Sequence, residues 1–330
     1  MKPRISVVIP THKRPESLSV ALDAILNQTY PKKKYEVIVV SDTQDDTLHI
    51  VEKKFRKKGV RFYRIENKCC DAKRNFGIKK AKGEIIAFTD DDCIPDSDWL
   101  ENLGAAFRKN KDAAGVEGLI YSNYKHLYEQ APENLTGKKY ISANYAFKRS
   151  VLIETKGFDE RYCYFAEDTD LGFKVISAGY NIVFDPKVRV FHPAKKISPL
   201  QIIKNLHMVR NNLLLHKKFP KLFKEHFGYR LIRDFILGLF AWLLLFFYAM
   251  AILVPIFILL AIPFTLIGVF YVITKARQRE YKITELLAYC FFLYVRYLML
   301  VPTSAYYWLK ISSEVTYKGD SNADSFFASK

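Results

Sequence analysis

Cysteine is scarce in this chain of 330 residues, which has only five. Two are adjacent, at Cys69 and Cys70, and the others are far apart, at Cys93, Cys163 and Cys290. Their number is odd and their spacing matches no zinc-binding pattern, which argues against a disulfide framework and against a structural zinc site. We therefore expect reduced thiols.

A secretory leader is also missing, because no basic stretch with a short apolar core and a cleavage site precedes the first apolar strand. Entry into the secretory route requires such a segment. We therefore expect the N-terminal region, residues 1–195, to face the cytoplasm.

Charge is absent from one long run, Ile236–Ile273. A soluble helix would not stay apolar on all sides for that length, whereas one bilayer crossing needs about 20 apolar residues. The run therefore predicts a transmembrane hairpin at residues 235–274, made of two short crossings with a turn near Pro255 to Pro263.

Acidic residues are scarce on both sides of this run. Between Lys195 and Arg233, ten Lys or Arg residues are accompanied only by Glu225 as an acid. More basic residues follow the run, at Lys275, Arg277, Arg279 and Lys282. Such clusters are attracted to anionic membrane lipids by ~1 kcal/mol per charge and favour the cytoplasmic side. We expect a multi-pass protein of the cell membrane with both ends of the hairpin in the cytoplasm.

Residues 196–234 are predicted to form basic amphipathic juxtamembrane helices. Within them, apolar residues recur at helical spacing between 200 and 215, beside basic positions. This pattern fits a helix that lies on a membrane and equally a helix that packs on the preceding domain. The sequence leaves these two possibilities open.

A third apolar segment, Leu286–Leu309, has Arg296 near its middle. A charge at the centre of a bilayer is expensive unless it faces protein, water or a lipid headgroup. We interpret residues 275–310 as a basic loop plus a helix that either crosses the membrane or lies at its interface. Residues 311–330 are predicted to be a polar tail.

Strand and helix patterns alternate along the first part of the chain. Such alternation predicts an α/β fold with a parallel sheet that is covered on both faces. After a helix at Trp99–Lys109 the pattern becomes more antiparallel. The predicted strands are Ile5–Ile9, Tyr35–Val40, Arg61–Ile65, Ile85–Phe88, Gly115–Tyr121, Ser142–Phe147 and Ile182–Phe184.

Three consecutive carboxylates, Asp90, Asp91 and Asp92, follow the strand Ile85–Phe88 directly. Burying a strand end beside this charge is unfavourable unless a cation is near. Alternate residues of an extended chain point the same way, so Asp90 and Asp92 are predicted to converge on one hard divalent ion. Ligands bind beyond the carboxyl ends of strands in open sheets, and Asp42 follows another strand at this edge.

Several ordered motifs together resemble the family 2 glycosyltransferases, whose GT-A fold is a Rossmann-like mixed sheet that binds a nucleotide sugar. One departure is Ser41, where the family has the first of two paired Asp residues. The motifs that carry the resemblance are Ser6–Thr11, Val39–Asp42, Asp71–Gly77, Asp90–Asp92, Asn144–Arg149, Gly157–Glu160, Glu167–Leu171 and Val190–Pro193.

The resemblance implies how the donor is held. A UDP- or GDP-sugar is the expected donor, and the residues expected to bind its nucleotide are Thr11, Asp42, Arg74 and Asp90. Asp92 and His192 are expected to hold a metal ion, either Mn²⁺ or Mg²⁺, since both accept oxygen ligands.

The resemblance also implies how the sugar is transferred. Asn144 and Glu167 are expected to line the sugar and acceptor side, and Asp168 is expected to be the catalytic base. A sugar hydroxyl is a poor nucleophile at neutral pH, so a carboxylate that takes its proton is useful. The implied reaction is an inverting transfer with no covalent sugar–enzyme intermediate.

Three other functions are compatible with parts of the sequence. Processive members of the family carry a Gln-x-x-Arg-Trp motif, which is absent, so transfer of one sugar to a membrane glycan, lipid-linked by expectation, is favoured. A polyprenyl-phosphate acceptor would need no general base, so the intact Glu167–Leu171 motif favours a hydroxyl acceptor. The net charge of +17 also suits a non-catalytic, basic, membrane-anchored binding protein. The carboxylates at the strand ends would repel nucleic acid, which is not an expected partner.

Overall fold

The computed structural model describes residues 4–66, 69–254, 256–277 and 279–317. The chain divides into two compact units. The first, called here the sheet unit, comprises residues 1–123 and 131–194. The second, called the helical unit, comprises residues 124–130 and 195–330.

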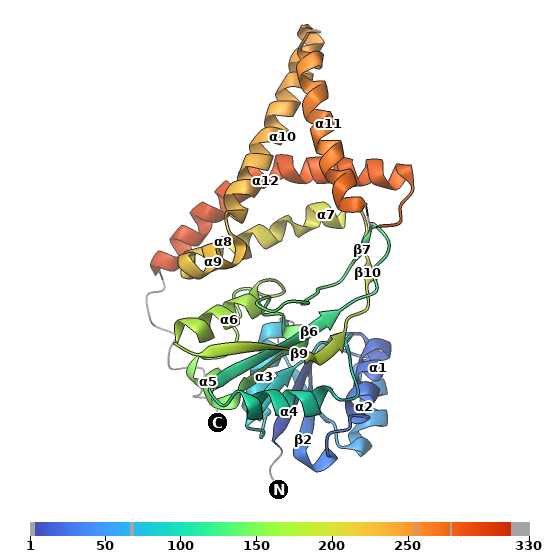
Figure 1. Ribbon diagram of the computed structural model, residues 1–330, viewed down its shortest axis with the longest axis vertical. Coiled ribbons are helices and arrows are strands. Elements are labelled where there is room, and N and C mark those ends of the chain that lie inside the picture. The colour runs from blue at the N-terminus through green and yellow to red at the C-terminus, as the bar shows by residue number, and fades with distance from the viewer. Residues whose placement is uncertain (1–3, 67–68, 255, 278, 318–330) are drawn as a thin grey trace. The chain divides into compact units, whose positions relative to one another are not determined.

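The sheet unit is built on one eight-stranded mixed sheet, with the strand order β3-β2-β1-β4-β8-β6-β9-β5 (Figure 1). The first half of the sheet is parallel, since β1 pairs in parallel with both β2 and β4, whereas β8 runs antiparallel to β4 and β6. The predicted Rossmann-like mixed sheet is therefore confirmed. Its strands are β1 (Ile5–Pro10), β2 (Tyr35–Asp42), β3 (Arg61–Ile65), β4 (Ile85–Phe88), β5 (Ile94–Pro95), β6 (Ala113–Tyr121), β8 (Tyr145–Lys148) and β9 (Asn181–Phe191).

Helices cover both faces of this sheet. Ile5, Val7 and Ile9 of β1 point to one face and share a core with α1, α2 and α4. Val8 points to the opposite face and meets α3, where a Cβ added at Gly77 would lie 2.3 Å from Val8 Cγ1. The helices of the unit are α1 (Pro15–Leu26), α2 (Leu48–Phe55), α3 (Cys70–Lys80), α4 (Trp99–Lys109), α5 (Arg149–Glu154) and α6 (Glu167–Ser177), with short 3₁₀ turns η1 (Lys32–Lys34), η2 (Arg56–Lys58) and η3 (Ser142–Asn144).

Two segments differ from the sequence prediction. The strand expected at Ser142–Phe147 begins with the turn η3 and becomes extended only at Tyr145. Strand β9 is much longer than Ile182–Phe184, because it pairs with β6 on both sides of an irregularity at Gly118/Leu119 and then with β5. This longer strand carries the chain to His192.

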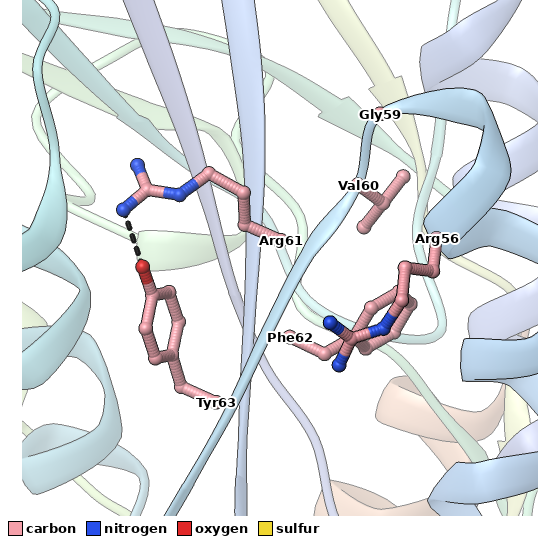
Figure 2. A pocket seen from close by; sticks show the side chains of 6 residues that line it. All are labelled: Arg56, Gly59, Val60, Arg61, Phe62 and Tyr63. Atoms are coloured by element: carbon pink, nitrogen blue, oxygen red, sulfur yellow. Dashed lines mark hydrogen bonds between the residues drawn. The ribbon is translucent and has the colours of Figure 1, made fainter.

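A surface hollow lies at the edge strand β3, around the amino end of that strand (Figure 2). Arg61 donates a hydrogen bond to the Tyr63 hydroxyl there. The hollow has no acidic side chain and lies toward the edge of the sheet opposite to the carboxyl ends, so we assign it no role in catalysis. It is lined by Arg56, Gly59, Val60, Arg61, Phe62 and Tyr63.

Within its described residues, the helical unit contains three helices that are long and apolar enough to cross a membrane, judged by length and composition. They are α10, α11 and α12, and α10 and α11 form a hairpin (Figure 1). The elements are β7 (Glu129–Gln130), β10 (Lys195–Lys196), α7 (Gln201–Lys204), η4 (Asn205–His207), α8 (Met208–Lys218), α9 (Pro220–Phe227), α10 (Arg230–Leu253), α11 (Phe257–Ala276) and α12 (Ile283–Tyr317).

The ends of these helices refine the sequence interpretation. Helix α11 begins at Phe257 and contains Pro263, so the hairpin turn lies earlier than the predicted range suggests. Helix α12 continues to Tyr317, into the range expected to be a polar tail. The rest of that tail, 318–330, lies outside the described residues.

Candidate active site

Four of the predicted nucleotide and metal residues lie at the carboxyl ends of neighbouring strands. Thr11 follows β1, Asp42 ends β2, and Asp90 and Asp92 follow β4. Because β1 pairs in parallel with both β2 and β4, these ends meet at one edge of the sheet. The structure thus brings together residues that are up to 81 positions apart in the sequence.

A group of metal-ligand side chains, called here the metal cluster, consists of Asp90, Asp92 and His192. The Nε2 atom of His192 is 3.4 Å from Asp92 Oδ1. The ligand atoms of these residues and of Cys93 all lie within 4.8 Å of one another. Antiparallel pairing of Ile94 with Phe191 explains the approach, since it brings the end of β9 beside the segment after β4.

The donor set of the metal cluster fits a hard divalent cation. Two carboxylates and an imidazole suit Mn²⁺ or Mg²⁺ better than a soft metal. Burial raises the pKa of Cys93 well above its ordinary value, so its sulfur stays a neutral thiol and is a poor ligand. Asp92 and His192 would therefore hold the ion, with Asp90 beside them.

Arg14, which no sequence motif indicated, is a protein cation next to the metal cluster. Its Nη1 atom lies 3.0 Å from Asp91 Oδ1 and 3.2 Å from Asp92 Oδ2. Asp91 also accepts a 2.8 Å hydrogen bond from the Thr11 hydroxyl, and it is not part of the group of metal-ligand side chains. Burial raises the pKa of Asp91, although the charge of Arg14 opposes the rise.

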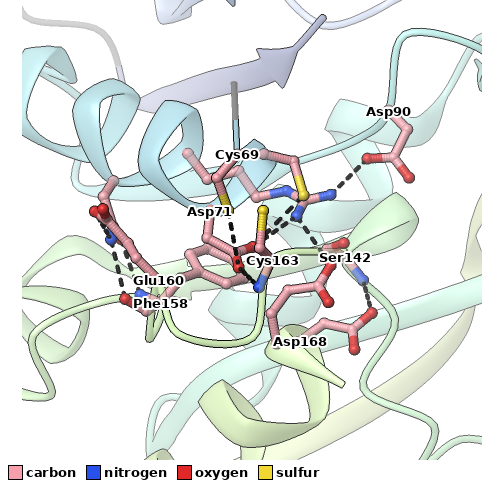
Figure 3. Close-up of polar contacts among 12 residues, drawn as sticks. Cys69, Asp71, Asp90, Ser142, Phe158, Glu160, Cys163 and Asp168 are labelled. Atoms are coloured by element: carbon pink, nitrogen blue, oxygen red, sulfur yellow. Dashed lines mark hydrogen bonds and ion pairs between the residues drawn. The ribbon is translucent and has the colours of Figure 1, made fainter. Parts of the chain in front are cut away.

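A second group, called here the arginine cluster, consists of Asp71, Arg74, Glu167 and Asp168 (Figure 3). Arg74 is only 3% exposed. Its Nη1 atom is 3.3 Å from Glu167 Oε1 and 3.5 Å from Asp71 Oδ1, and its Nη2 atom is 2.8 Å from Asp90 Oδ1. Arg74 therefore joins the two clusters.

Burial raises the pKa values of the acids of the arginine cluster. Burial, reinforced by the charge of Glu167, raises the pKa of Asp71 to about 9. Burial also raises the pKa of Glu167, and the charge of Arg74 opposes that rise. One buried guanidinium is thus insufficient to keep all the neighbouring carboxyl groups ionised.

Asp168 lies in the first turn of α6, beside Glu167. Its Oδ1 atom accepts the Thr169 N–H at 2.8 Å and its Oδ2 atom accepts the Ser142 N–H at 3.1 Å. Burial and the neighbouring charge of Glu167 raise the pKa of Asp168 to about 7. A fixed carboxylate that titrates near neutrality has the properties of a general base.

The loop that follows α5 is fastened to helix α3 by Asn75 (Figure 3). The Asn75 amide donates to Phe158 O at 2.9 Å and to Glu160 Oε1 at 3.0 Å, and its oxygen accepts the Phe158 N–H at 2.9 Å. The Phe158 ring then lies 5.4 Å from the Arg74 guanidinium, a cation–π contact. Asn75 therefore helps to hold Arg74 in place.

Asp42 is buried in an ion-pair network that the sequence did not indicate. Its Oδ2 atom lies 3.0 Å from Lys73 Nζ and 2.6 Å from His12 Nδ1. Burial would raise the pKa of Asp42, but Lys73 and His12 lower it overall. Lys73 is itself 2% exposed and donates to Thr11 O at 2.9 Å, so it ties β1 to β2.

Ser41, the departure from the family pattern, belongs to a local turn. Its hydroxyl donates to Asp45 Oδ2 at 2.6 Å, and Asp45 Oδ1 accepts the N–H groups of Thr47 and Leu48 at the start of α2. Burial alone would raise the pKa of Asp45, but these hydrogen bonds lower it to about 2. Ser41 thus supports a turn in which Asp45 accepts backbone N–H groups at the start of α2.

Asn144, expected on the sugar and acceptor side, has its amide engaged within the fold. It accepts from Trp99 Nε1 at 2.9 Å and donates to Leu119 O at 3.0 Å and to Val188 O at 2.8 Å. It is 2% exposed. Both amide hydrogens are used, so its predicted contact with a sugar would require this network to open.

Comparison with known proteins identifies the domain that carries these clusters. The profile described as Glycosyl transferase family 2 matches residues 6–166. The chain carries a family 2 glycosyltransferase domain. The matched residues include Asp42, Arg74, Asp90 and Asp92 but end just before Glu167. Asp168 and His192 are therefore assigned to the site by their position in the structure and not by the family match.

Two named relatives are glycosyltransferases as well. Glycosyltransferase AglE of Haloferax volcanii is 28% identical over 217 residues, which cover 60% of this chain and 69% of that protein. The glucosyl-dolichyl phosphate glucuronosyltransferase of the same organism is 28% identical over 177 residues, covering 47% of this chain and 56% of the relative.

The fold comparison agrees as well. The crystal structure of S. aureus TarS 1-349 in complex with UDP-GlcNAc matches with a TM-score of 0.51 and 19% identity, covering 64% of this chain and 66% of that chain. At 19% identity this similarity supports the GT-A fold. The family 2 domain thus has both the sequence motifs and the sheet of its family.

Proposed function

We propose that this protein is an inverting, metal-dependent glycosyltransferase. It moves one sugar from a nucleotide-sugar donor to a hydroxyl group of a membrane glycan acceptor that is linked to a lipid. It does so without processive polymer synthesis. The observation that carries this proposal is the approach of Asp92 and His192, 3.4 Å apart, beside the arginine cluster.

The metal cluster is proposed to receive the donor diphosphate. Asp92 and His192 would hold Mn²⁺ or Mg²⁺, with Asp90 beside the ribose or a metal-bound water. A bound divalent ion would neutralise charge on the diphosphate leaving group. Arg74, which already contacts Asp90 at 2.8 Å, would add a charge-assisted hydrogen bond to the same group.

Asp168 is proposed to act as the base. Its two oxygens each accept one backbone hydrogen bond, which leaves a lone pair free to accept the proton of an acceptor hydroxyl. The oxygen that loses this proton attacks the anomeric carbon from the face opposite to the departing nucleoside diphosphate. The C–O bond to the leaving group breaks as the new one forms, and the configuration inverts.

The donor nucleotide is proposed to lie over the edge formed by Thr11 and Asp42. UDP- and GDP-sugars are the two donor types that we propose to test first. The TarS structure was solved with UDP-GlcNAc, which supports a nucleotide sugar as donor. Since Asp42 is already paired with Lys73, a nucleotide would share this carboxylate rather than find it free.

A hydroxyl acceptor is favoured over a polyprenyl phosphate. A phosphate is already ionised at neutral pH and needs no base, whereas Asp168 has a pKa raised to about 7. The relative named a glucosyl-dolichyl phosphate glucuronosyltransferase supports an acceptor that is a sugar carried by a lipid. The helical unit has long apolar helices with basic residues on both sides of the hairpin. These features support attachment to anionic membrane lipids, with the catalytic domain in the cytoplasm.

The proposal is tested with full-length protein in detergent or proteoliposomes, a panel of UDP- and GDP-sugars, and Mn²⁺ or Mg²⁺. We expect release of nucleoside diphosphate from one donor, dependent on the metal, and faster release when lipid-linked glycans are added. Absence of turnover with every donor, in protein that binds nucleotide and metal, would favour a non-catalytic binding protein. Acceleration by bare polyprenyl phosphate would favour the phosphate acceptor instead.

A further inference from the structure

The turn of the α10–α11 hairpin is apolar. The sequence has no polar side chain from Ala249 to Phe264, and the turn lies in the middle of this stretch, after Leu253. Ile252 and Ile256 beside the turn are 84% and 64% exposed. A turn that emerged into water beyond a membrane would hydrate all of these side chains, which is unfavourable. The turn is therefore better suited to hydrocarbon than to water.

The backbone around the turn is hydrogen-bonded, as hydrocarbon requires. The Val254 N–H donates to Met250 O at 2.8 Å, and the Phe257 N–H donates to Val254 O at 3.1 Å. The nearest polar side chains on either side also pair with each other, since Tyr248 Oη lies 2.8 Å from Thr265 Oγ1. The N–H groups of Val254 and Phe257 and the hydroxyls of Tyr248 and Thr265 can therefore enter the membrane with their hydrogen bonds made.

Helix α12 packs across α10 rather than alongside it (Figure 1). The Trp242 indole donates to Leu298 O at 2.9 Å. At Gly238 an added Cβ would lie 2.6 Å from Val301 Cγ2, so the glycine permits the two helices to approach closely. The crossing is thus fixed to the stretch of α10 between Gly238 and Trp242.

Helix α12 also packs on the base of α11. Val272 and Ala276, close to the end of α11, share a small apolar core with Leu286 of α12. The first half of α12 therefore meets α11 near its last turn, and a later part meets α10. Both arms of the hairpin rise from the level of α12.

The arms are too short to cross a bilayer from that level. Between Trp242 and Leu253, α10 has about 12 residues, or ~18 Å at 1.5 Å per residue. Between Phe257 and Val272, α11 has about 16 residues, or ~24 Å. The hydrocarbon core of a bilayer is about 30 Å thick. If α12 lies at one membrane surface, the turn ends inside the bilayer.

Arg296 indicates that α12 does lie at the surface. It stands among the α12 residues that meet α10, and its Nε atom is buried without a hydrogen-bond partner among the described residues. It lies close enough to Arg230, the first residue of α10, for the two charges to interact. A crossing α12 would bring this cation to mid-bilayer, whereas an interfacial α12 brings it to lipid phosphates.

We propose that the helical unit is a monotopic anchor. The α10–α11 hairpin enters one leaflet and returns to the same side, and α12 lies in the interface with Arg296 among lipid phosphates. This inference replaces the transmembrane hairpin that the sequence predicts at residues 235–274. It rests on the membrane attachment proposed above and is independent of the chemistry of sugar transfer.

The depth of the turn tests the proposal. Full-length Val254→Trp protein is reconstituted in vesicles of lipids brominated either near the headgroup or near the chain end. We expect the extra emission of this variant over the native sequence to be quenched most by the deep bromines. The emission of Trp242, taken as the difference between the native sequence and Trp242→Phe, should be quenched most by the shallow bromines. Strongest quenching of the Val254→Trp emission by shallow bromines would overturn the proposal.

Surface labelling tests the same point in cells. A Val254→Cys variant is treated with a membrane-impermeant maleimide, with the native sequence and its five cysteines as the background control. We expect only background labelling in intact cells and additional labelling after detergent. Additional labelling in intact cells would mean that the hairpin crosses. Protein that fails to float with vesicles would remove the anchor and the proposed attachment together, while donor turnover in detergent would still test the catalytic proposal separately.

Discussion

The two acidic clusters of the sheet unit are joined by Arg74 but differ in what neutralises them. In the metal cluster, Asp92 is paired with Arg14, whose side chain is 51% exposed and is shared with Asp91, and Asp90 is paired with Arg74. In the arginine cluster, the cation is Arg74, which is 3% exposed and contacts two acids of its own cluster. The arginines of the metal cluster are thus both shared with acids outside it, whereas the arginine cluster holds acids whose pKa values are raised.

This difference matches two chemical tasks. A group that must receive a diphosphate benefits from a mobile divalent ion, because that ion can arrive and leave with the nucleotide. A group that must accept a proton benefits from a pKa near the working pH, which the protein obtains by burying carboxyl groups together. The comparison predicts that the clusters respond differently to metal, to pH and to substitution.

Asp92→Ala is expected to have the largest effect, loss of all metal-dependent activity. Removing this ligand leaves His192 without its carboxylate partner at 3.4 Å. We would measure nucleoside diphosphate release, and Mn²⁺ binding by electron paramagnetic resonance, with Asp98→Asn as the matched control at an exposed helix start. Full activity in Asp92→Ala, or activity unchanged by EDTA in the native protein, would remove the metal from the proposal.

Asp168→Asn is expected to lower the transfer rate by ~10²–10⁴-fold, the usual contribution of a general base. Donor binding, measured by isothermal titration calorimetry, should stay within a few-fold of the native value, because Asp168 does not contact Arg74 or the metal ligands directly. The exposed Asp112→Asn is the control. Loss of donor binding in parallel with transfer would assign Asp168 a structural role.

Arg74→Lys is expected to lower the rate by roughly 10–100-fold, the worth of one or two charged hydrogen bonds. An ammonium group cannot match the fork with which Arg74 reaches Asp90 and Glu167 together. Arg64→Lys, at an arginine paired with Glu52 on the surface, is the control. Thermal unfolding should be followed as well. A rate equal to native would mean that Arg74 serves packing only.

The pH dependence should report the arginine cluster. Burial and Glu167 raise the pKa of Asp168 to about 7, so its base form is lost as the pH falls through about 7. Below that point kcat should fall about tenfold per pH unit and above it should level off. The residual rate of Asp168→Asn should lack this step. A step that persists in the variant would belong to another group.

Arg14→Ala should have the smallest effect, tightening Mn²⁺ binding to the nucleotide-free protein by roughly 2–5-fold. The arginine competes with the ion for Asp92, but an ion pair this exposed is worth only ~0.2–1 kcal/mol. Titration of Mn²⁺ into the variant and native proteins measures the change. Weaker Mn²⁺ binding in Arg14→Ala would show that Arg14 organises the ligands instead of competing.

The sheet and its acidic edge were predictable because they depend on short-range patterns. The runs at Arg61–Ile65 and Ile85–Phe88 became β3 and β4 with unchanged bounds, and Trp99–Lys109 became α4. Strand β9 was underestimated because its second half, Asp185–Phe191, is interrupted by Pro186 and reads as loop. The hydrogen bonds of β9 to β6 and β5 hold this segment extended, although its local sequence has low strand propensity.

The charge network was less predictable, since its partners are far apart in the sequence. Lys73 reads as a surface lysine of a helix, yet it is buried against Asp42, 31 residues earlier. Glu117 likewise reads as an exposed strand residue, yet it is 2% exposed and accepts the N–H groups of Lys139 and Tyr140 at 3.1 and 3.0 Å. Burial of a single charge depends on tertiary partners that no local pattern encodes.

The short segment between β6 and η3 has a practical consequence for anyone who divides this gene. Residues 124–130 belong to the helical unit, where Tyr128 Oη donates to Glu285 O at 3.0 Å and Arg279 lies 3.6 Å from the Tyr124 ring. The polypeptide therefore passes between the units more than once. A fragment that ends at Ala194 would keep residues 124–130 but lose the helices that contact them. Conversely, residues 195–330 transferred alone to another enzyme would lack residues 124–130 and the contacts that these make.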